Sequence, residues 1–109
     1  MKQHCKDFSV DHLSPGEKTI AQRLIDLLPE YATGGGCKAF YSPKEWKIRG
    51  EKYGTESLLV VVHDGGDFAS LCNLDYAAVS AYEKMQSSLH EVGLYMQQCT
   101  SWYSAVYAI

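Results

Sequence analysis

The sequence predicts a single α+β domain over residues 1–109, built on an antiparallel sheet of four to six strands with two helices packed on one face. Two observations predict this class. Apolar residues recur at helical spacing in two segments, and the segments between and after them have the short apolar or alternating patterns of strands. The expected order is α-β-β-β-β-α-β, which suits an antiparallel sheet covered on one side. At 109 residues, 46% of them hydrophobic, the chain can bury a modest core.

The first helix is expected to begin at Ser14-Pro15-Gly16-Glu17. Ser14 is a typical N-cap, Pro15 suits the first helical position, and Glu17 completes a capping box. The apolar stripe that follows consists of Ile20, Ala21, Leu24, Leu27 and Leu28. Because Pro29 disfavours helical geometry at the residue before it, this helix should end near residues 28–31.

Two strands are expected next, over residues 37–41 and 44–49. The second alternates charged and apolar residues, which predicts a half-buried strand with Trp46 and Ile48 inward. Short length, the intervening Pro43 and the lysines indicate that both are edge strands.

Residues 58–73 have the pattern of a β-hairpin. Gly65-Gly66 can supply the positive φ that both central positions of a type I′ turn require, and in that register Val61 faces Ser70. One face of the hairpin is wholly apolar, and the other is mixed but mostly apolar. We therefore expect the hairpin to be an interior pair of strands, covered on both faces.

A second helix and a C-terminal β segment complete the chain. Asn73 or Asp75 can cap the helix, and Gly93 is placed to end it as a C′ glycine. Its apolar stripe is Val79, Tyr82, Met85, Leu89 and Val92. Residues 94–109 predict one bent strand or two short ones, broken near residues 99–101.

The charge distribution is more informative than the net charge of −3. Residues 38–54 carry five basic and two acidic side chains, whereas residues 55–109 carry six acidic side chains and one basic side chain. From residue 92 onward the sequence has no charged side chain. Such asymmetry can steer a partner, although a solvated hairpin that happens to be basic is the simpler explanation. The mild net charge argues against direct nucleic-acid binding. No run approaches the roughly 18 apolar residues of a membrane span, and no signal peptide is expected.

The polar cluster most suggestive of chemistry is His63, Asp64 and Asp67, at the expected hairpin tip. Opposed carboxylates can bind a cation, but a hard metal normally needs further oxygen ligands. Aspartates that accept backbone N–H bonds in the turn are the competing interpretation. The sequence predicts no cofactor.

Two further catalytic or metal arrangements fit less well. In the expected register Cys72 lies four residues along the strand from His63, about 13 Å away at roughly 3.3 Å per residue, which is too far for a nucleophile and its base. A zinc site would have to assemble from His4, Cys5, His12 and Cys37, without a Cys-x-x-Cys or a paired-histidine motif.

The aromatic C-terminal segment is apolar on both faces, like the central hairpin. Trp102 lies on one face, and Tyr103 and Tyr107 lie on the other. Two short helices cover one face of such a sheet, so the second face must meet the N-terminal arm, another copy of the chain or a target. Tyr and Trp are enriched at protein interfaces, and core packing remains the alternative.

The second half of the chain resembles small proteins of phages and mobile elements. The stretches that carry the resemblance are Val60-Val61-Val62-His63-Asp64-Gly65-Gly66-Asp67 and Gln98-Cys99-Thr100-Ser101-Trp102-Tyr103-Ser104-Ala105-Val106-Tyr107. The resemblance implies a phage-encoded anti-defence protein, of which anti-CRISPR proteins are the best-populated kind. These are often compact single domains that block a surface of a nuclease complex. No catalytic motif accompanies the resemblance.

The expected function is therefore a non-enzymatic inhibitor in the cytoplasm of a bacterial host. Its partner would be a host defence protein or ribonucleoprotein, such as a Cas effector. The expected contact residues are Trp46, Lys47, Arg49, His63, Asp64, Asp67, Trp102, Tyr103 and Tyr107. Two alternatives stay open: a small hydrolase or metal-dependent enzyme built on His63, Asp64 and Asp67, and a homodimeric structural or regulatory protein.

Overall fold

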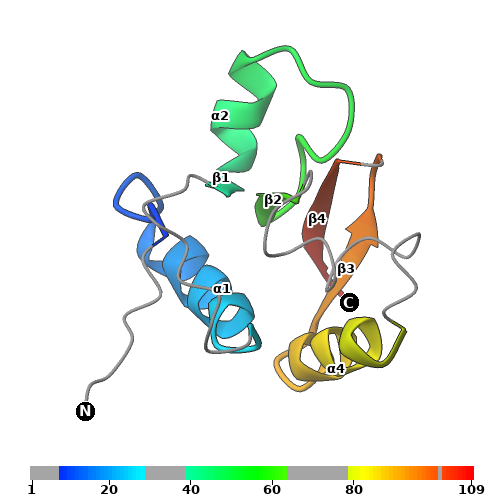
Figure 1. Ribbon diagram of the computed structural model, residues 1–109. Coiled ribbons are helices and arrows are strands. Elements are labelled where there is room, and N and C mark those ends of the chain that lie inside the picture. The colour runs from blue at the N-terminus through cyan, green and yellow to red at the C-terminus, as the bar shows by residue number, and fades with distance from the viewer. Residues whose placement is uncertain (1–7, 29–38, 64–78, 101) are drawn as a thin grey trace.

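The computed structural model describes residues 8–28, 39–63, 79–100 and 102–109, and confirms an α+β fold with a four-stranded antiparallel sheet (Figure 1). The elements are α1 (Pro15–Ile25), β1 (Phe40–Tyr41), α2 (Pro43–Ile48), β2 (Leu59–Val62), α4 (Val79–His90), β3 (Leu94–Gln98) and β4 (Tyr103–Ala108). The strands lie in the order β1-β2-β4-β3. Within the described ranges, no helix is long and apolar enough to cross a membrane.

Helix α1 begins as its sequence predicts. The Ser14 hydroxyl accepts a hydrogen bond from the Glu17 N–H at 3.2 Å, and the Glu17 carboxylate accepts one from the Ser14 N–H at 2.9 Å. This capping box satisfies two N–H groups that a helix start otherwise leaves open. The α-helix ends at Ile25, and a tighter turn, in which the Leu28 N–H donates to the Ile25 carbonyl, carries the chain to residue 28.

Strand β2 lies inside the sheet, as expected, but its neighbours differ from the prediction. Residues 64–73, the second half of the expected hairpin, lie outside the described residues. Val61 pairs with Phe40 of β1 on one edge and with Ser104 of β4 on the other, so its expected pairing with residue 70 is wrong. Both edges of β2 at this position are hydrogen-bonded to described strands.

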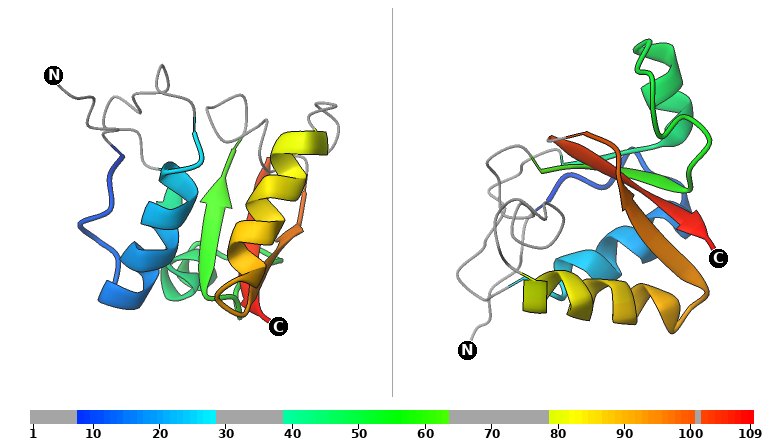
Figure 2. Two further views of the ribbon diagram at one scale, coloured as in Figure 1. Left: turned by 90° about the horizontal axis from the view of Figure 1, so that it is seen from below. Right: turned by 90° about the vertical axis from the view of Figure 1, so that its right-hand side faces the viewer.

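The main core fills the space between one sheet face and the two longer helices. In Figure 2, α1 and α4 lie together on one side of the sheet and α2 lies on the other. Leu24 of α1 and Met85 of α4 are fully buried against Leu59 and Val61 of β2 and Val106 of β4. The prediction that two helices pack on one face is therefore confirmed.

The strand predicted over residues 44–49 is wrong, because this part of the chain forms helix α2, Pro43–Ile48. The Ser42 hydroxyl accepts a hydrogen bond from the Glu45 N–H at 3.0 Å, and Pro43 occupies the first helical position, so the segment starts as a helix. Trp46 is buried, as expected, but Ile48 is 79% exposed and does not point inward. Among the described residues, the order of elements therefore has a helix, α2, between β1 and β2, where the prediction placed a strand.

A second, smaller core lies on the other sheet face. Trp46 packs there against Val60 of β2 and Tyr103 of β4. Gly54, in the loop after α2, has φ +79°, and a Cβ added there would lie 3.3 Å from the Ala105 Cβ, so the loop also approaches this face closely. Both faces of β2 are covered, as predicted, and α2 supplies the cover that we expected from an arm, a second copy or a target.

The C-terminal segment forms two short strands, one of the two predicted arrangements. The Thr100 hydroxyl accepts hydrogen bonds from the N–H groups of Trp102 and Tyr103 at 3.2 and 3.3 Å, which fixes the turn between β3 and β4. Gly93 ends the turn after α4 with φ +77°, the conformation expected of a C′ glycine.

Candidate functional site

Helix α2 and its outer side chains form an exposed surface among the residues that the structure describes. Figures 1 and 2 show α2 on the opposite side of the sheet from α1 and α4, projecting from the body of the protein. Lys44, Lys47, Ile48 and Arg49 are all exposed, and we call these four residues the α2 surface. Two of them, Lys47 and Arg49, are among the contact residues expected from the sequence.

Trp46 anchors α2 to the sheet. Its ring centroid lies 4.9 Å from that of Tyr41, 5.0 Å from that of Tyr103 and 5.8 Å from that of Trp102. The Arg49 guanidinium lies 4.7 Å from the indole centroid, a distance typical of a cation–π contact. A six-residue helix is unstable on its own, so these contacts hold α2 in place.

The α2 surface keeps a positive charge. Arg49 donates to the Glu51 carboxylate at 3.2 and 3.3 Å, which offsets its charge. Lys44, Lys47 and nearby Lys52 form no ion pair within the described part of the chain. An approaching partner therefore meets lysine ammonium groups that are not paired with any carboxylate of the described residues.

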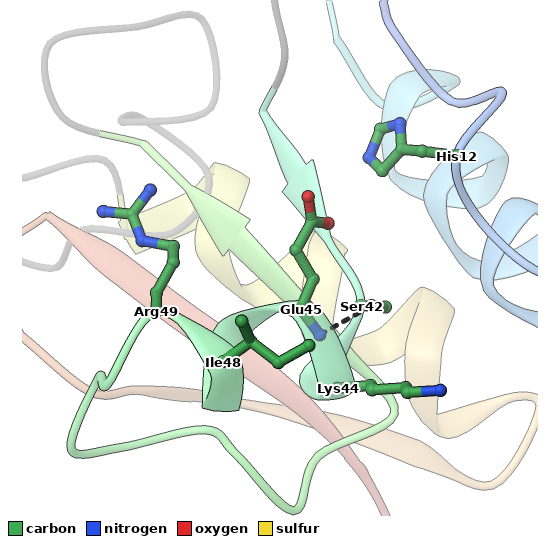
Figure 3. Close-up of a pocket in the computed structure, with 6 residues that line it drawn as sticks. All are labelled: His12, Ser42, Lys44, Glu45, Ile48 and Arg49. Atoms are coloured by element: carbon green, nitrogen blue, oxygen red, sulfur yellow. Dashed lines mark hydrogen bonds between the residues drawn. The ribbon is translucent and has the colours of Figure 1, made fainter.

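A shallow hollow of about 370 Å³ lies beside α2. Its lining residues are His12, Ser42, Lys44, Glu45, Ile48 and Arg49. In Figure 3 the Ile48 side chain lies between Arg49 and Lys44, which point to opposite sides, while His12 lies across from them on the N-terminal segment. The His12 Nε2 is 2.7 Å from the Phe40 carbonyl oxygen, so this imidazole is fixed against the edge of the sheet.

The structure places several of the expected contact residues inside the protein. Trp46, His63 and Tyr103 are at most 2% exposed, so they support the surface and do not form it. Trp102 and Tyr107 are half-buried. The two aspartates of the expected hairpin tip, Asp64 and Asp67, lie outside the described residues.

His63 is an interior residue of the sheet. It follows β2, is 1% exposed, and its Nε2 lies 2.9 Å from the hydroxyl of the fully buried Ser104. Its backbone N–H donates to the Trp102 carbonyl at 2.9 Å. A histidine and a serine at this distance resemble a base and a nucleophile, but both side chains are closed off from solvent. The contact therefore acts in this structure as a buried cross-strand hydrogen bond.

The metal and cysteine arrangements considered from the sequence are described only in part. No cluster of three or more His, Cys, Asp or Glu side chains suitable for a metal occurs among the residues that the structure describes. Of the four residues considered for zinc, only His12 is described, and it contacts the Phe40 carbonyl. Cys72 also lies outside the described residues.

Side chains cap both outer edges of the sheet. His12 contacts the Phe40 carbonyl on β1, and on β3 the Gln86 side chain accepts from the Met96 N–H at 2.9 Å and donates to the Met96 carbonyl at 2.7 Å. Exposed strand edges are templates for pairing with other chains. At these positions the backbone groups already have partners, so edge pairing is a weaker basis for recognition here than the α2 surface.

A second, uncharged surface lies on β3 and β4. The half-buried rings of Tyr95 and Tyr107 stack with centroids 5.7 Å apart. Burial raises the pKa of the Tyr107 hydroxyl, and nearby Cys99, Tyr95 and Glu56 raise it further. Burial likewise raises the pKa of the Cys99 thiol, which disfavours the reactive thiolate.

The sequence prediction missed Lys44 and Ile48 as surface residues, and His12 and Gln86 as edge caps. A signal for Lys44 and Ile48 was present, because Ser42-Pro43 followed by Glu45 is a helix start like that of α1. The two caps join residues distant in sequence, and no local pattern indicates them.

Comparisons with protein-family models, with curated proteins and with solved structures find no match for this chain. No site or activity of a relative can therefore be carried over to its residues.

Proposed function

We propose that the protein is a non-catalytic inhibitor that binds a bacterial defence complex through the α2 surface. The observation that carries this proposal is the exposure of Ile48, 79%, on a helix whose opposite side is fixed by the fully buried Trp46. A large apolar side chain held rigidly in water, beside Lys44 and Lys47, which form no ion pair within the described residues, favours a contact surface over a merely solvated helix.

The resemblance of residues 60–107 to small phage and mobile-element proteins supports the choice of partner. It favours a nuclease complex in the cytoplasm of the host, such as a Cas effector. The lysines of the α2 surface favour an acidic patch on the protein part of that complex, because complementary charge speeds encounter and selects the partner. Neither a cofactor nor a direct contact with nucleic acid or membrane is part of the proposal.

Burial of one side chain sets the scale of the expected effect. Complete burial of an isoleucine contributes about 1.5–3 kcal/mol, or roughly ten- to a hundredfold in affinity. An aspartate at the same place adds the cost of desolvating a charge. Ile48→Asp should therefore abolish inhibition while leaving the fold intact, because the side chain has little internal packing to lose.

Phage plating on bacteria that carry a defined CRISPR–Cas system tests the proposal. Expression of the chain should raise plating on immune cells, and Ile48→Asp should remove that effect. Ile109→Asp is the matched control, because Ile109 is 76% exposed but lies at the C-terminus after β4. Equal loss with both variants would contradict the α2 surface.

A binding assay with purified effector complexes separates inhibition from effects on expression. The wild-type chain should bind the complex whose immunity it blocks, and Ile48→Asp should not. Failure to raise plating on any immune host, together with failure to bind the purified complexes, would refute the proposed function.

The homodimer is retained as a second candidate because of the surface on β3 and β4. Residues 92–109 carry no charged side chain, and the stacked pair Tyr95 and Tyr107 is half-exposed there. A surface without charge can meet its own copy across a two-fold axis without like-charge repulsion. Light scattering on the purified chain tests this candidate, and a strictly monomeric mass would remove it.

A further inference from the structure

Helix α2 buries a single side chain against the sheet. Of its six residues, Trp46 is the one that is buried, and its indole packs against Val60 and Tyr103. In the loop that follows, the Tyr53 N–H donates to the Tyr103 hydroxyl at 3.3 Å. The rest of α2 projects from the body of the protein, on the side of the sheet opposite α1 and α4 (Figures 1 and 2). Docking of α2 therefore depends on how favourable the burial of this one indole is.

The backbone of α2 forms its hydrogen bonds with its own neighbourhood. We call residues 42–53 the α2 segment. The Trp46 N–H donates to the Ser42 carbonyl at 3.0 Å, within this segment. The ion pair of Arg49 with Glu51, at 3.2 Å, also lies within it. The segment can therefore leave the sheet without breaking a backbone hydrogen bond of the main core.

The buried indole has one polar atom that opposes its docking. The Trp46 Nε1–H is buried and has no hydrogen-bond partner among the described residues. A buried donor of this kind loses its hydrogen bond to water and gains none in return. When the indole leaves the sheet, water binds this N–H again. The docked state is therefore less favoured over an open one than burial of the apolar ring alone would make it.

We infer that the α2 segment opens as a unit, in a minor population on the order of 1%, while the sheet and the two longer helices stay folded. Opening releases Trp46 and breaks the bond between Tyr53 and Tyr103. A helix of six residues does not persist alone, so its amides then exchange with solvent. Because the gap between the states is only about a hundredfold, one change at Trp46 is enough to remove the α2 surface without unfolding the core.

Native-state hydrogen exchange of the full ¹⁵N-labelled chain tests the inference. The reporters are the amides of Trp46, Arg49 and Tyr53, and the references are those of Val62 and His63, which bond to the chain on either side of β2. The reporters should share one protection factor of about a hundred, and the references should be protected at least about tenfold more. Low urea should lower the protection of all three reporters together, because opening exposes apolar surface.

Three outcomes of the exchange experiment would overturn the inference. Reporters as well protected as the references would show that α2 leaves the sheet only when the whole protein unfolds. Unequal protection among the three reporters, without a common response to urea, would show fraying of single residues. Reporters without any protection would show that α2 is not docked.

A chemical substitution tests the role of the unpaired N–H. Trp46→benzothienylalanine, made by chemical ligation, replaces the indole N–H by sulfur and keeps the shape of the ring. Protection of the Arg49 and Tyr53 amides should rise about fivefold or more, and the references should not change. Ile48→Ala is the matched control, because it shortens an exposed side chain on the same helix and should change reporter protection by less than about threefold. Unchanged or lower protection with the sulfur analogue, or an equal rise with Ile48→Ala, would overturn the inference.

The opening of α2 does not depend on the proposed function, and the two tests fail independently. Opening as a unit without inhibition of any defence complex would refute the proposed function and leave the opening. Inhibition through Ile48, with reporters as well protected as the references, would refute the opening and leave the function standing.

Discussion

Replacement of Trp46 by alanine tests whether α2 is an integral part of the fold. Trp46 is fully buried between Val60, Tyr103 and the rings of Tyr41 and Trp102. Loss of the indole would leave a cavity on the second face of the sheet and remove the main contact that holds α2. We therefore expect Trp46→Ala to destabilise the protein strongly and to release the helix that carries the α2 surface.

The expected magnitude follows from the burial of the side chain and from one unsatisfied polar atom. An aromatic side chain of this size buries on the order of 150–250 Å², which corresponds to about 4–6 kcal/mol at about 25 cal/mol per Å². The indole Nε1–H is buried without a hydrogen-bond partner in the described structure, which costs about 1–3 kcal/mol. The difference gives a loss of about 3 kcal/mol in the free energy of unfolding, within the usual range for such truncations.

Urea unfolding followed by far-UV circular dichroism measures this loss, with Trp46→Phe as the control. Phenylalanine keeps an aromatic ring in the cluster and removes the unsatisfied N–H, so we expect a loss of about 1 kcal/mol or less. A loss below about 1 kcal/mol for the alanine variant would show that the second core does not stabilise the fold. Equal losses for the two variants would refute the assignment of the effect to the aromatic cluster.

Four further substitutions have expected outcomes. Gln86→Ala removes both hydrogen bonds to Met96, so unfolding free energy should fall by about 1–2 kcal/mol and light scattering should detect self-association through the freed β3 edge. Ser42→Ala removes the N-cap of α2 and should lower stability by about 1 kcal/mol in urea unfolding. Because the pKa of Tyr107 is raised above its usual 10.0, its folded form holds the phenolic proton more firmly than the unfolded chain does. Its contribution to the free energy of unfolding is therefore present below pH 10 and is lost as the pH rises through the pKa of the folded state. Tyr107→Phe should therefore reduce the loss of stability at alkaline pH. Ile48→Lys should change unfolding free energy by less than about 0.5 kcal/mol, because the side chain is 79% exposed.

Each of these four has a result that would contradict it. For the edge cap, Gln22→Ala is the control, because the Gln22 side chain donates to Asp26 on the exposed side of α1 and makes no contact with a strand edge in the described part of the chain. Equal losses would count against a special role for Gln86. Full stability of Ser42→Ala would show that the cap contributes nothing to α2. Identical stability curves above pH 10 for the wild type and Tyr107→Phe would contradict the raised pKa. A loss above about 2 kcal/mol for Ile48→Lys would indicate that this side chain is buried after all.

The features that the sequence predicted correctly are those that depend on a few adjacent residues. The capping box from Ser14 to Glu17 placed the start of α1, and the positive φ of Gly93 was expected from its position after the stripe of α4. The two-faced apolar pattern of β2 indicated an interior strand covered on both sides, which the structure confirms. In each case a few adjacent residues contain the whole physical reason.

The pairing of the strands is a non-local property and was predicted wrongly. Alternation determines which face each side chain of β2 takes, but not which strand lies beside it. A tight turn after β2 favoured its nearest neighbour in sequence, whereas Val61 pairs with Phe40 and with Ser104, which lie about twenty residues before it and more than forty after it. The entropic cost of pairing strands that are far apart in the sequence grows only slowly with their separation. Burial of β2 on both faces offsets this cost.

The position of the candidate site could have been derived from the sequence, and helix geometry explains why it was not. Trp46 and Ile48 are two residues apart, a spacing that places both on one face of a strand but about 200° apart around a helix. The choice between a strand and a helix therefore depends on whether a helix start precedes Trp46. Ser42-Pro43 followed by Glu45 repeats the Ser-Pro-x-Glu pattern that correctly placed the start of α1. Once the segment is a helix, burial of Trp46 against Tyr103 requires Ile48 to face outward. The exposed isoleucine among lysines is thus the geometric consequence of a tryptophan anchor in a short capped helix. For the same reason, a substitution that removes the anchor should also remove the contact surface.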